Sequence, residues 1–146
     1  MSKDLAPGSG EDYERFFSLH PDLMCIADST GHFVRLNQAW ERILGYPASQ
    51  LLGTSYLDLV HPDDLDATRG AMSTLDSMGE VEGFVNRYRH RDGSWRFIEW
   101  RSQQHGSLVY AIARDVTERR AADEQLRLSL IRSRELIDSI TETLWS

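Results

Sequence analysis

The six residues Asp-Val-Thr-Glu-Arg-Arg at positions 115–120 divide this chain of 146 residues into two parts of different character. Asp115 and Thr117 can accept hydrogen bonds from the free backbone N–H groups at a helix start, and Asp115 and Glu118 have capping-box spacing. Upstream, the pattern predicts short strands and helices; downstream, it predicts one long helix. The sequence therefore indicates a mixed domain whose last strand passes directly into an outgoing helix.

Hydrophobic patterning upstream of this junction predicts a short N-terminal helix followed by the order β-β-α-α-α-β-β-β. The expected strands cover 23–27, 33–36, 84–90, 94–102 and 108–114. The expected helices cover 11–19, 38–44, 47–52 and 62–78, with Asn37 capping the second of them. This order predicts an α+β domain in which one antiparallel sheet carries its helices on one face.

Charge and cysteine content limit the function classes. The net charge of −7 argues against a nucleic-acid partner. Cys25 is the single cysteine, so no intramolecular disulfide can form, which fits a reducing compartment. No run approaches eighteen apolar residues, and residues 1–10 lack the apolar segment of a secretory signal. We therefore expect a cytoplasmic protein without a membrane span, with a disordered tail over residues 1–10.

The segment 121–146 carries apolar residues at heptad spacing. This seam consists of Leu126, Leu130, Ser133, Ile137, Ile140 and Leu144. It predicts a coiled-coil helix in a homodimer, with the two helices parallel. The alternative is a single amphipathic helix lying on its own domain.

The end of the chain repeats a pattern from its beginning. Residues 134–139 resemble residues 14–19, and the likeness continues from 24–25 to 144–145 at the same offset. An internal repeat of this kind predicts that the chain runs into the start of a second copy of the domain.

Four motifs in order then give the chain a family resemblance. They are Asp-Ser-Thr-Gly at 28–31 followed by Asn-Gln-Ala-Trp at 37–40 and Gly-Tyr at 45–46; Leu-Gly at 52–53 followed by Val-His-Pro-Asp-Asp at 60–64; Arg-Tyr-Arg-His-Arg-Asp-Gly-Ser-Trp at 87–95; and Asp-Val-Thr-Glu-Arg at 115–119. Over residues 11–120 the chain resembles the PAS family of sensory domains, and the last motif resembles the family's terminal junction. The resemblance implies a five-stranded antiparallel sheet, with a ligand pocket between its inner face and the helices. It also implies an outer face that packs on flanking helices or a second subunit.

The resemblance implies a sensor or dimerisation domain from a bacterial-type signalling protein. A signal would pass through Asp115, Thr117, Glu118 and Arg119 to an output domain in the same polypeptide, such as the histidine kinase of a two-component system or a cyclic-dinucleotide enzyme. We expect no enzyme activity in this segment. None of the five histidines has metal-pair spacing, and no phosphate-binding glycine loop is present.

The resemblance also indicates which of the family's cofactors this chain could bind. Tyr56 stands where light-sensing members carry their reactive cysteine, so the resemblance implies no flavin–cysteinyl photochemistry. Residues 65–79 hold no histidine, whereas oxygen-sensing members bind haem through one there. His61 precedes that helix and is interpreted as a structural cap. We therefore expect neither flavin nor haem, and a redox, gas or light sensor is the more distant alternative.

Strand alternation in register with the family assigns side chains to the two sheet faces. Those expected to face the pocket are Cys25, Ala27, Phe33, Asn86, Tyr88, Ile98, Trp100, Val109, Ala111 and Ala113. Those expected on the outer face are Met24, Ile26, Val34, Phe97, Tyr110 and Ile112; with Phe16, Phe17 and the apolar seam, they are the candidate dimer interface. Two interpretations stay open: Asn86, Tyr88 and Trp100 bind a small organic ligand, or they satisfy one another inside a ligand-free relay module.

Overall fold

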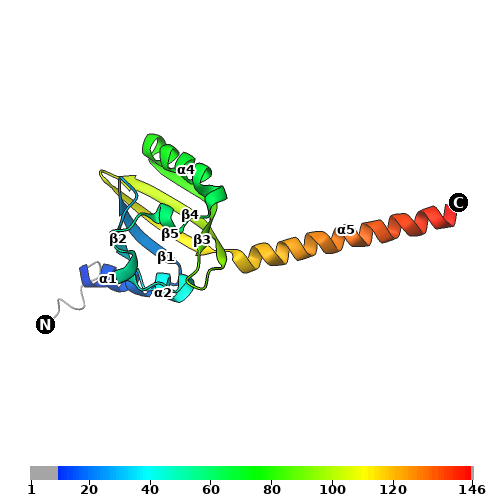
Figure 1. The fold of residues 1–146 in the computed structure, drawn as a ribbon, viewed down its shortest axis with the longest axis horizontal. Coiled ribbons are helices and arrows are strands. Elements are labelled where there is room, and N and C mark those ends of the chain that lie inside the picture. The colour runs from blue at the N-terminus through cyan, green and yellow to red at the C-terminus, as the bar shows by residue number, and fades with distance from the viewer. Residues whose placement is uncertain (1–9, 146) are drawn as a thin grey trace. The chain divides into compact units, whose positions relative to one another are not determined.

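Five strands form one antiparallel sheet in the order β2-β1-β5-β4-β3 (Figure 1), so the first and last strands of the domain are central neighbours. The structure is a computed structural model that describes residues 10–145. The strands are β1 (Leu23–Asp28), β2 (Phe33–Leu36), β3 (Glu80–Arg89), β4 (Trp95–His105) and β5 (Leu108–Asp115). The predicted α+β class and the predicted order of the five strands along the chain are confirmed. The tail predicted for residues 1–10 lies, apart from Gly10, outside the described residues.

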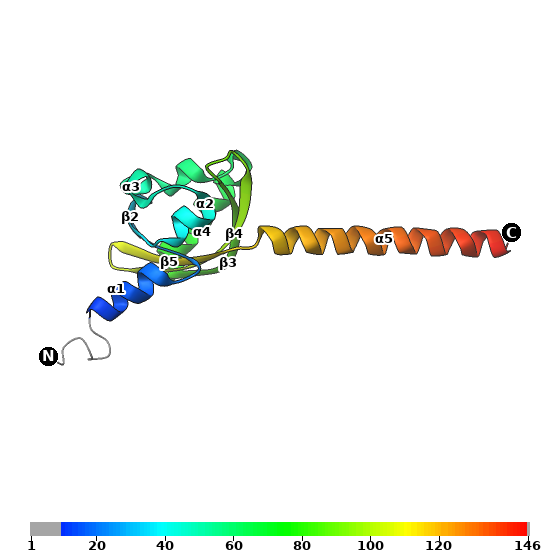
Figure 2. The same cartoon turned by 90° about the horizontal axis from the view of Figure 1, so that it is seen from below.

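Helices lie on both faces of this sheet. They are α1 (Gly10–Leu19), α2 (Ala39–Leu44), α3 (Ala48–Leu51), the 3₁₀ turns η2 (Tyr56–Leu59) and η3 (Pro62–Asp64), and α4 (Leu65–Met78). Figure 2 shows α2, α3 and α4 on one face and α1 on the other. The inner face is therefore the one covered by α4, which packs against β3 and β4.

Local signals explain where α4 begins and ends. The ring Nδ1 of His61 accepts a hydrogen bond from the backbone N–H of Asp63 at 3.0 Å, which satisfies a free donor at the helix start. His61 thus caps the η3–α4 segment, as its position predicted. At the other end, Gly79 adopts a φ of +83° and donates its N–H to the carbonyl of Leu75, a left-handed C-terminal cap.

The capping role predicted for Asn37 is wrong. Gln38 precedes α2, and no side chain caps that helix. Asn37 is 3% exposed, and its side chain instead accepts from the N–H of Met24 at 3.0 Å and donates to the carbonyl of Asp22 at 2.9 Å. The side-chain amide of Asn37 therefore forms hydrogen bonds with backbone groups at the start of β1.

Strands β3 and β4 extend further than expected, and their pairing contains a bulge. β3 begins at Glu80, and its pairing with β4 shifts register between Glu82 and Phe84. The intervening Gly83 has a φ of +74°, a conformation that glycine adopts at low cost. The bulge changes the alternation of β3, so that both Val81 and Phe84 reach the inner face.

The core is built on aromatic side chains beneath α2. Trp40 is fully buried and packs against Phe33, with ring centroids 5.0 Å apart. Tyr88 and Trp100 continue this cluster, with centroids 5.3 Å apart. These ring contacts pack side chains of β2, β3 and β4 against α2.

From Val116 onward the chain forms a second unit. Its helix α5 (Thr117–Trp145) is continuous over 29 residues. The apolar seam residues of α5 (Leu126, Leu130, Ile137, Ile140 and Leu144) are each at least 60% exposed. Within residues 10–145, no helix is long and apolar enough to cross a membrane.

Candidate ligand pocket and relay residues

A cavity of about 70 Å³ lies between α4 and the inner face of the sheet. Side chains from all five strands, η2 and α4 line it. Among the described residues, every one that lines the cavity has an uncharged side chain. The volume would hold roughly five water molecules.

Eight of the ten residues predicted to face the pocket line this cavity. They are Cys25, Ala27, Phe33, Asn86, Tyr88, Trp100, Val109 and Ala111. The other two, Ile98 and Ala113, are buried at 0% and 2% exposure but do not line it. Whether any of these residues binds a ligand stays a prediction.

The sequence did not assign the helical wall. Thr68, Ala71, Met72 and Leu75 reach the cavity from α4, and Tyr56 reaches it from η2. Met72 and Leu75 are apolar residues of the helix expected over 62–78, but the sequence does not show what they cover. Three residues on strands were missed as well. Phe84 precedes Asn86 by two, so alternation could have found it. Ser102 follows Trp100 by two and could have been found from alternation, whereas Val81 depends on the Gly83 bulge.

Three buried polar side chains form a chain of hydrogen bonds across the cavity wall. The indole Nε1 of Trp100 donates to Asn86 Oδ1 at 2.8 Å, and Asn86 Nδ2 donates to Thr68 Oγ1 at 3.1 Å. Thr68 Oγ1 in turn donates to the carbonyl of Asp64 at 2.7 Å. Asn86 and Trp100 thus satisfy one another, as the second sequence interpretation holds.

Tyr88 behaves differently from Asn86 and Trp100. It is 2% exposed, and its ring packs between Trp40 and Trp100. Among the described residues its hydroxyl has no hydrogen-bond partner. No fully enclosed side-chain oxygen or nitrogen of the described residues lacks a partner. The Tyr88 hydroxyl therefore borders open space, and the space that Tyr88 lines is the cavity.

The protonatable groups of the cavity are held neutral. Burial raises the pKa of the Cys25 thiol to about 12, so this cysteine is a buried thiol rather than a reactive thiolate. Burial also raises the pKa values of Tyr88 and Tyr56 above the ordinary tyrosine range. Tyr56, which the sequence resemblance aligns with the reactive cysteine of light-sensing members, lines the cavity from η2. Within residues 10–145, no group of three or more metal-ligating side chains gathers.

An ion pair fastens the start of α4 to β3. The carboxylate of Asp64 accepts hydrogen bonds from the N–H, Nε and Nη2 of Arg87 at 2.8, 2.9 and 2.7 Å. The hydrogen bond from the Arg87 side chain lowers the pKa of Asp64 below its usual range, against partial desolvation. This pair holds the helical wall of the cavity on the sheet.

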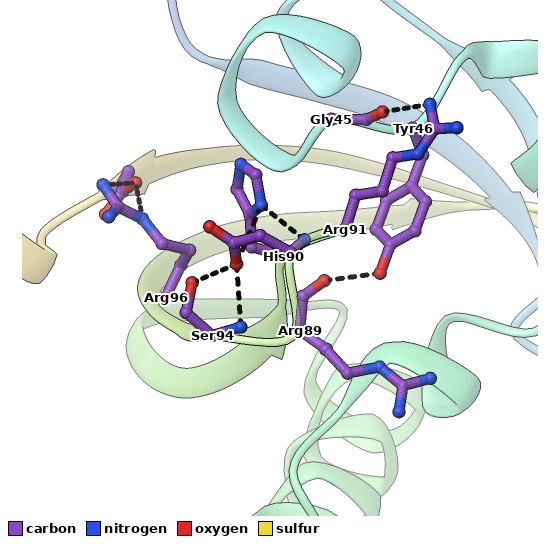
Figure 3. Close-up of polar contacts among 9 residues, drawn as sticks. Gly45, Tyr46, Arg89, His90, Arg91, Ser94 and Arg96 are labelled. Carbon is purple, nitrogen blue, oxygen red and sulfur yellow. Dashed lines mark hydrogen bonds and ion pairs between the residues drawn. The ribbon is translucent and has the colours of Figure 1, made fainter.

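The β3–β4 hairpin carries Arg96 (Figure 3), which positions one of the predicted relay residues. Arg96 Nε donates to Asp115 Oδ2 at 2.8 Å, which joins β4 to the end of β5. Arg91 follows β3, and its Nη1 lies 3.4 Å from the carbonyl oxygen of Gly45, while the Tyr46 hydroxyl donates to the carbonyl of Arg89 at 2.9 Å. The hairpin is thereby tied to the end of α2. The other predicted relay residues, Thr117, Glu118 and Arg119, lie in the first turn of α5.

A groove of about 610 Å³ lies between α1 and the outer face of the sheet. Six predicted interface residues line it: Phe16, Phe17, Met24, Ile26, Tyr110 and Ile112. Val34 is outside the groove and is 45% exposed. Phe97 is also outside it, with the Arg87 guanidinium 6.0 Å from its ring. Arg35 on β2 pairs with Glu14 and lies 4.6 Å over the ring of Phe17, which holds α1 against the sheet.

Sequence comparisons point to one family. A family model described as PAS fold matches residues 33–110, more than half of the chain. White collar 2 protein of Neurospora crassa is 25% identical over 80 residues, which are 55% of this chain and 15% of that protein. Uncharacterized protein y4lL of Sinorhizobium fredii is 27% identical over 145 residues, which are 92% of this chain and 17% of that protein. The chain thus spans less than a fifth of either relative.

Solved structures show the same fold. A PAS domain from Colwellia psychrerythraea is 23% identical with a TM-score of 0.68, covering 74% of this chain and 97% of that one. The PAS domain of an HTR-like protein from Haloarcula marismortui is 26% identical with a TM-score of 0.64, covering 72% and 89%. The PAS domain of the RpfR quorum-sensing receptor from Cronobacter turicensis, in complex with BDSF, is 20% identical with a TM-score of 0.60, covering 68% and 98%.

Proposed function

This chain belongs to the PAS fold family, and from that premise we propose that a small molecule in its cavity controls the pairing of two α5 helices. The observation that carries the proposal is the position of the cavity. Trp100 and Ala111 line it from β4 and β5, and β5 ends at Asp115, where the chain passes into α5. A change in cavity occupancy acts on the strands that lead to the helix. The segment is a binding and relay module rather than an enzyme.

The proposed assembly is a parallel homodimer. A second copy would cover the apolar groove beside α1, and the two apolar seams of α5 would pair. The exposure of that seam supports this part, because a helix with an exposed apolar stripe gains stability by burying it. Parallel pairing lets two identical downstream domains follow the helices in the same direction.

The proposed output is a further domain of the same polypeptide, a histidine kinase or a cyclic-dinucleotide enzyme in the cytoplasm. This chain spans less than a fifth of either relative, which supports an output domain elsewhere in a longer polypeptide. The structural relative from Cronobacter turicensis is the PAS domain of a quorum-sensing receptor in complex with BDSF, which supports small-molecule sensing in this fold.

The proposed mechanism is a shift between two arrangements of the α5 pair. A ligand moves such an equilibrium only if it binds one arrangement better than the other. The Asp64–Arg87 pair and the Asn86–Thr68 hydrogen bond hold α4 over the cavity, so occupancy that moves α4 must strain or break them.

The test measures α5 pairing and cavity occupancy on the same samples. Spin labels at Ser139→Cys report the distance between the two α5 helices, and Cys25 stays unlabelled because its thiol is buried. We expect native mass spectrometry to show dimers carrying a small molecule, and the label distance to change when it is removed. An unchanged distance would refute the proposed control of α5.

A matched pair of variants on α4 controls this test. Ala71 lines the cavity, so Ala71→Leu should fill it and abolish the ligand-dependent change. Ala67 is exposed on the same helix and does not line the cavity, so Ala67→Leu should leave the change intact.

The second candidate is a ligand-free dimerisation and relay module. The hydrogen bonds that link Asn86 to Trp100 and to Thr68 favour it, because these polar groups then need no ligand as a partner. It predicts dimers without added mass and a label distance that is the same in Ala71→Leu and in the parent protein.

A further inference from the structure

The polar side chains that line the cavity differ in whether another group of the protein forms a hydrogen bond with them. Asn86 and Thr68 bond to each other, and Trp100 bonds to Asn86. The Tyr88 hydroxyl has no partner among the described residues, although the residue is 2% exposed. Buried polar groups are nearly always hydrogen-bonded in folded proteins, so this hydroxyl marks the place of an acceptor that the protein does not supply.

The cavity lining limits the charge of such a partner. Every described residue that lines the cavity is uncharged, so an ion placed there would lose its hydration without gaining a counter-charge. Burial raises the pKa of Tyr88 and keeps its hydroxyl protonated, hence a donor, at physiological pH. A neutral acceptor matches both conditions.

The cavity volume limits the size of the partner. About 70 Å³ holds roughly five water molecules, and therefore about five non-hydrogen atoms, without movement of α4. Apolar side chains such as Ala27, Met72 and Val109 make up much of the remaining wall.

We infer that the cavity binds an uncharged, short-chain oxygenated organic molecule whose alcohol or carbonyl oxygen accepts the hydrogen bond of the Tyr88 hydroxyl. Its apolar body lies against the alanine, methionine and valine side chains of the wall. This inference rests on the proposed function, because it names the ligand class of the same cavity.

The test compares three probes of about five non-hydrogen atoms that differ at one end. Butan-1-ol carries a neutral acceptor, 1-chlorobutane carries none of comparable strength, and butylammonium carries a charge. Binding is followed by NMR at the indole N–H of Trp100, which lines the cavity. We expect saturable shifts with butan-1-ol, binding about tenfold weaker with 1-chlorobutane, and none with butylammonium.

The Tyr88→Phe variant isolates the hydroxyl. It keeps the ring against Trp40 and Trp100 and removes a group that has no protein hydrogen bond to lose. Its urea midpoint should therefore match that of the parent protein, while butan-1-ol should bind about tenfold more weakly. Tyr110→Phe, on the outer face at 43% exposure, should change neither quantity.

Each outcome supports or overturns the inference. Equal binding of butan-1-ol to the parent protein and to Tyr88→Phe, tight binding of butylammonium, or no binding of butan-1-ol would each overturn it. The α5 label distance in the same samples separates the two proposals. Tyr88-dependent binding without a change in distance refutes only the control of α5, and a change in distance without Tyr88 dependence refutes only the ligand class.

Discussion

The indole N–H of Trp100 on β4 donates a hydrogen bond to the side-chain oxygen of Asn86 on β3, 2.8 Å away, inside the core. The two residues are not directly opposed, because Asn86 pairs with Ile98 and Trp100 pairs with Phe84. The bond therefore runs diagonally across the inner face, and Asn86 extends it to Thr68 on α4. One amide thus joins two strands to the helix that closes the cavity.

Replacing Asn86 by leucine should destabilise the fold by about 1–3 kcal/mol, because it leaves the buried Trp100 indole N–H without an acceptor. In a Trp100→Phe background that donor is absent, so the same substitution should cost about 1 kcal/mol less. Urea denaturation followed by far-ultraviolet circular dichroism measures all four proteins. Equal costs in both backgrounds would show that the diagonal bond contributes no stability.

Asp64 should give the fold a stability that disappears in acid. Its pKa in the folded state is lowered by Arg87, so the pair contributes above the unfolded pKa of about 3.9 and is lost as pH falls through the lower folded value. Urea titrations from pH 7 to pH 2 should show Asp64→Asn less stable at neutral pH and converging with the parent protein in acid. The contribution is modest because the Asp64 side chain is partly exposed.

Asp66→Asn is the matched control for this pH dependence. Asp66 lies two residues further along, in the first turn of α4; its side chain is fully exposed, and its ion pair with Arg69 is 3.8 Å long. Its stability curve should run parallel to that of the parent protein. If Asp66→Asn converged in acid as Asp64→Asn does, the effect would come from net charge and not from the Arg87 pair.

Much of the sheet could be predicted because its signals are local. Alternation predicted the strands at 84–90 and 94–102 that form β3 and β4, and eight inward assignments place their side chains on the cavity. The same alternation fails at Val81, since one extra residue at Gly83 reverses the faces upstream of it. A glycine in a strand is a signal for a bulge but does not show which face the next residue takes.

The rest of the site depends on contacts between elements distant in sequence. Nothing near Thr68 indicates that its hydroxyl will meet Asn86, 18 residues later. The prediction for Asn37 failed in the opposite way. Its position just before α2 suggested a helix cap, whereas its hydrogen-bond partners lie at the start of β1. Side-chain amides can satisfy either local or distant backbone groups, and only the packed fold decides between them.

Gly45 should tolerate alanine less well than Gly79, although both have a left-handed φ near +85° and both end a helix. An alanine at either position bears a backbone cost of about 1 kcal/mol. At Gly45 the new Cβ would also lie 2.9 Å from Cβ of Arg91, whereas at Gly79 nothing lies within 4 Å. The N–H of Arg91 is bonded to the carbonyl of Leu44, so the hairpin cannot withdraw freely. We expect Gly45→Ala to cost about 2–3 kcal/mol in urea denaturation, and equal costs at the two glycines would contradict this close approach.

If the apolar seam of α5 pairs two chains, Ser133 is its weak position. It lies between Leu130 and Ile137 in the heptad spacing, so a leucine there should bury apolar surface in both helices of the dimer. We expect Ser133→Leu to tighten the dimer at least tenfold in sedimentation equilibrium. Ser139→Leu adds the same side chain two residues beyond Ile137, off the seam, and should leave the dissociation constant within about twofold. The same tightening from both variants would indicate nonspecific association of apolar surface, and no tightening from Ser133→Leu would refute pairing along this seam.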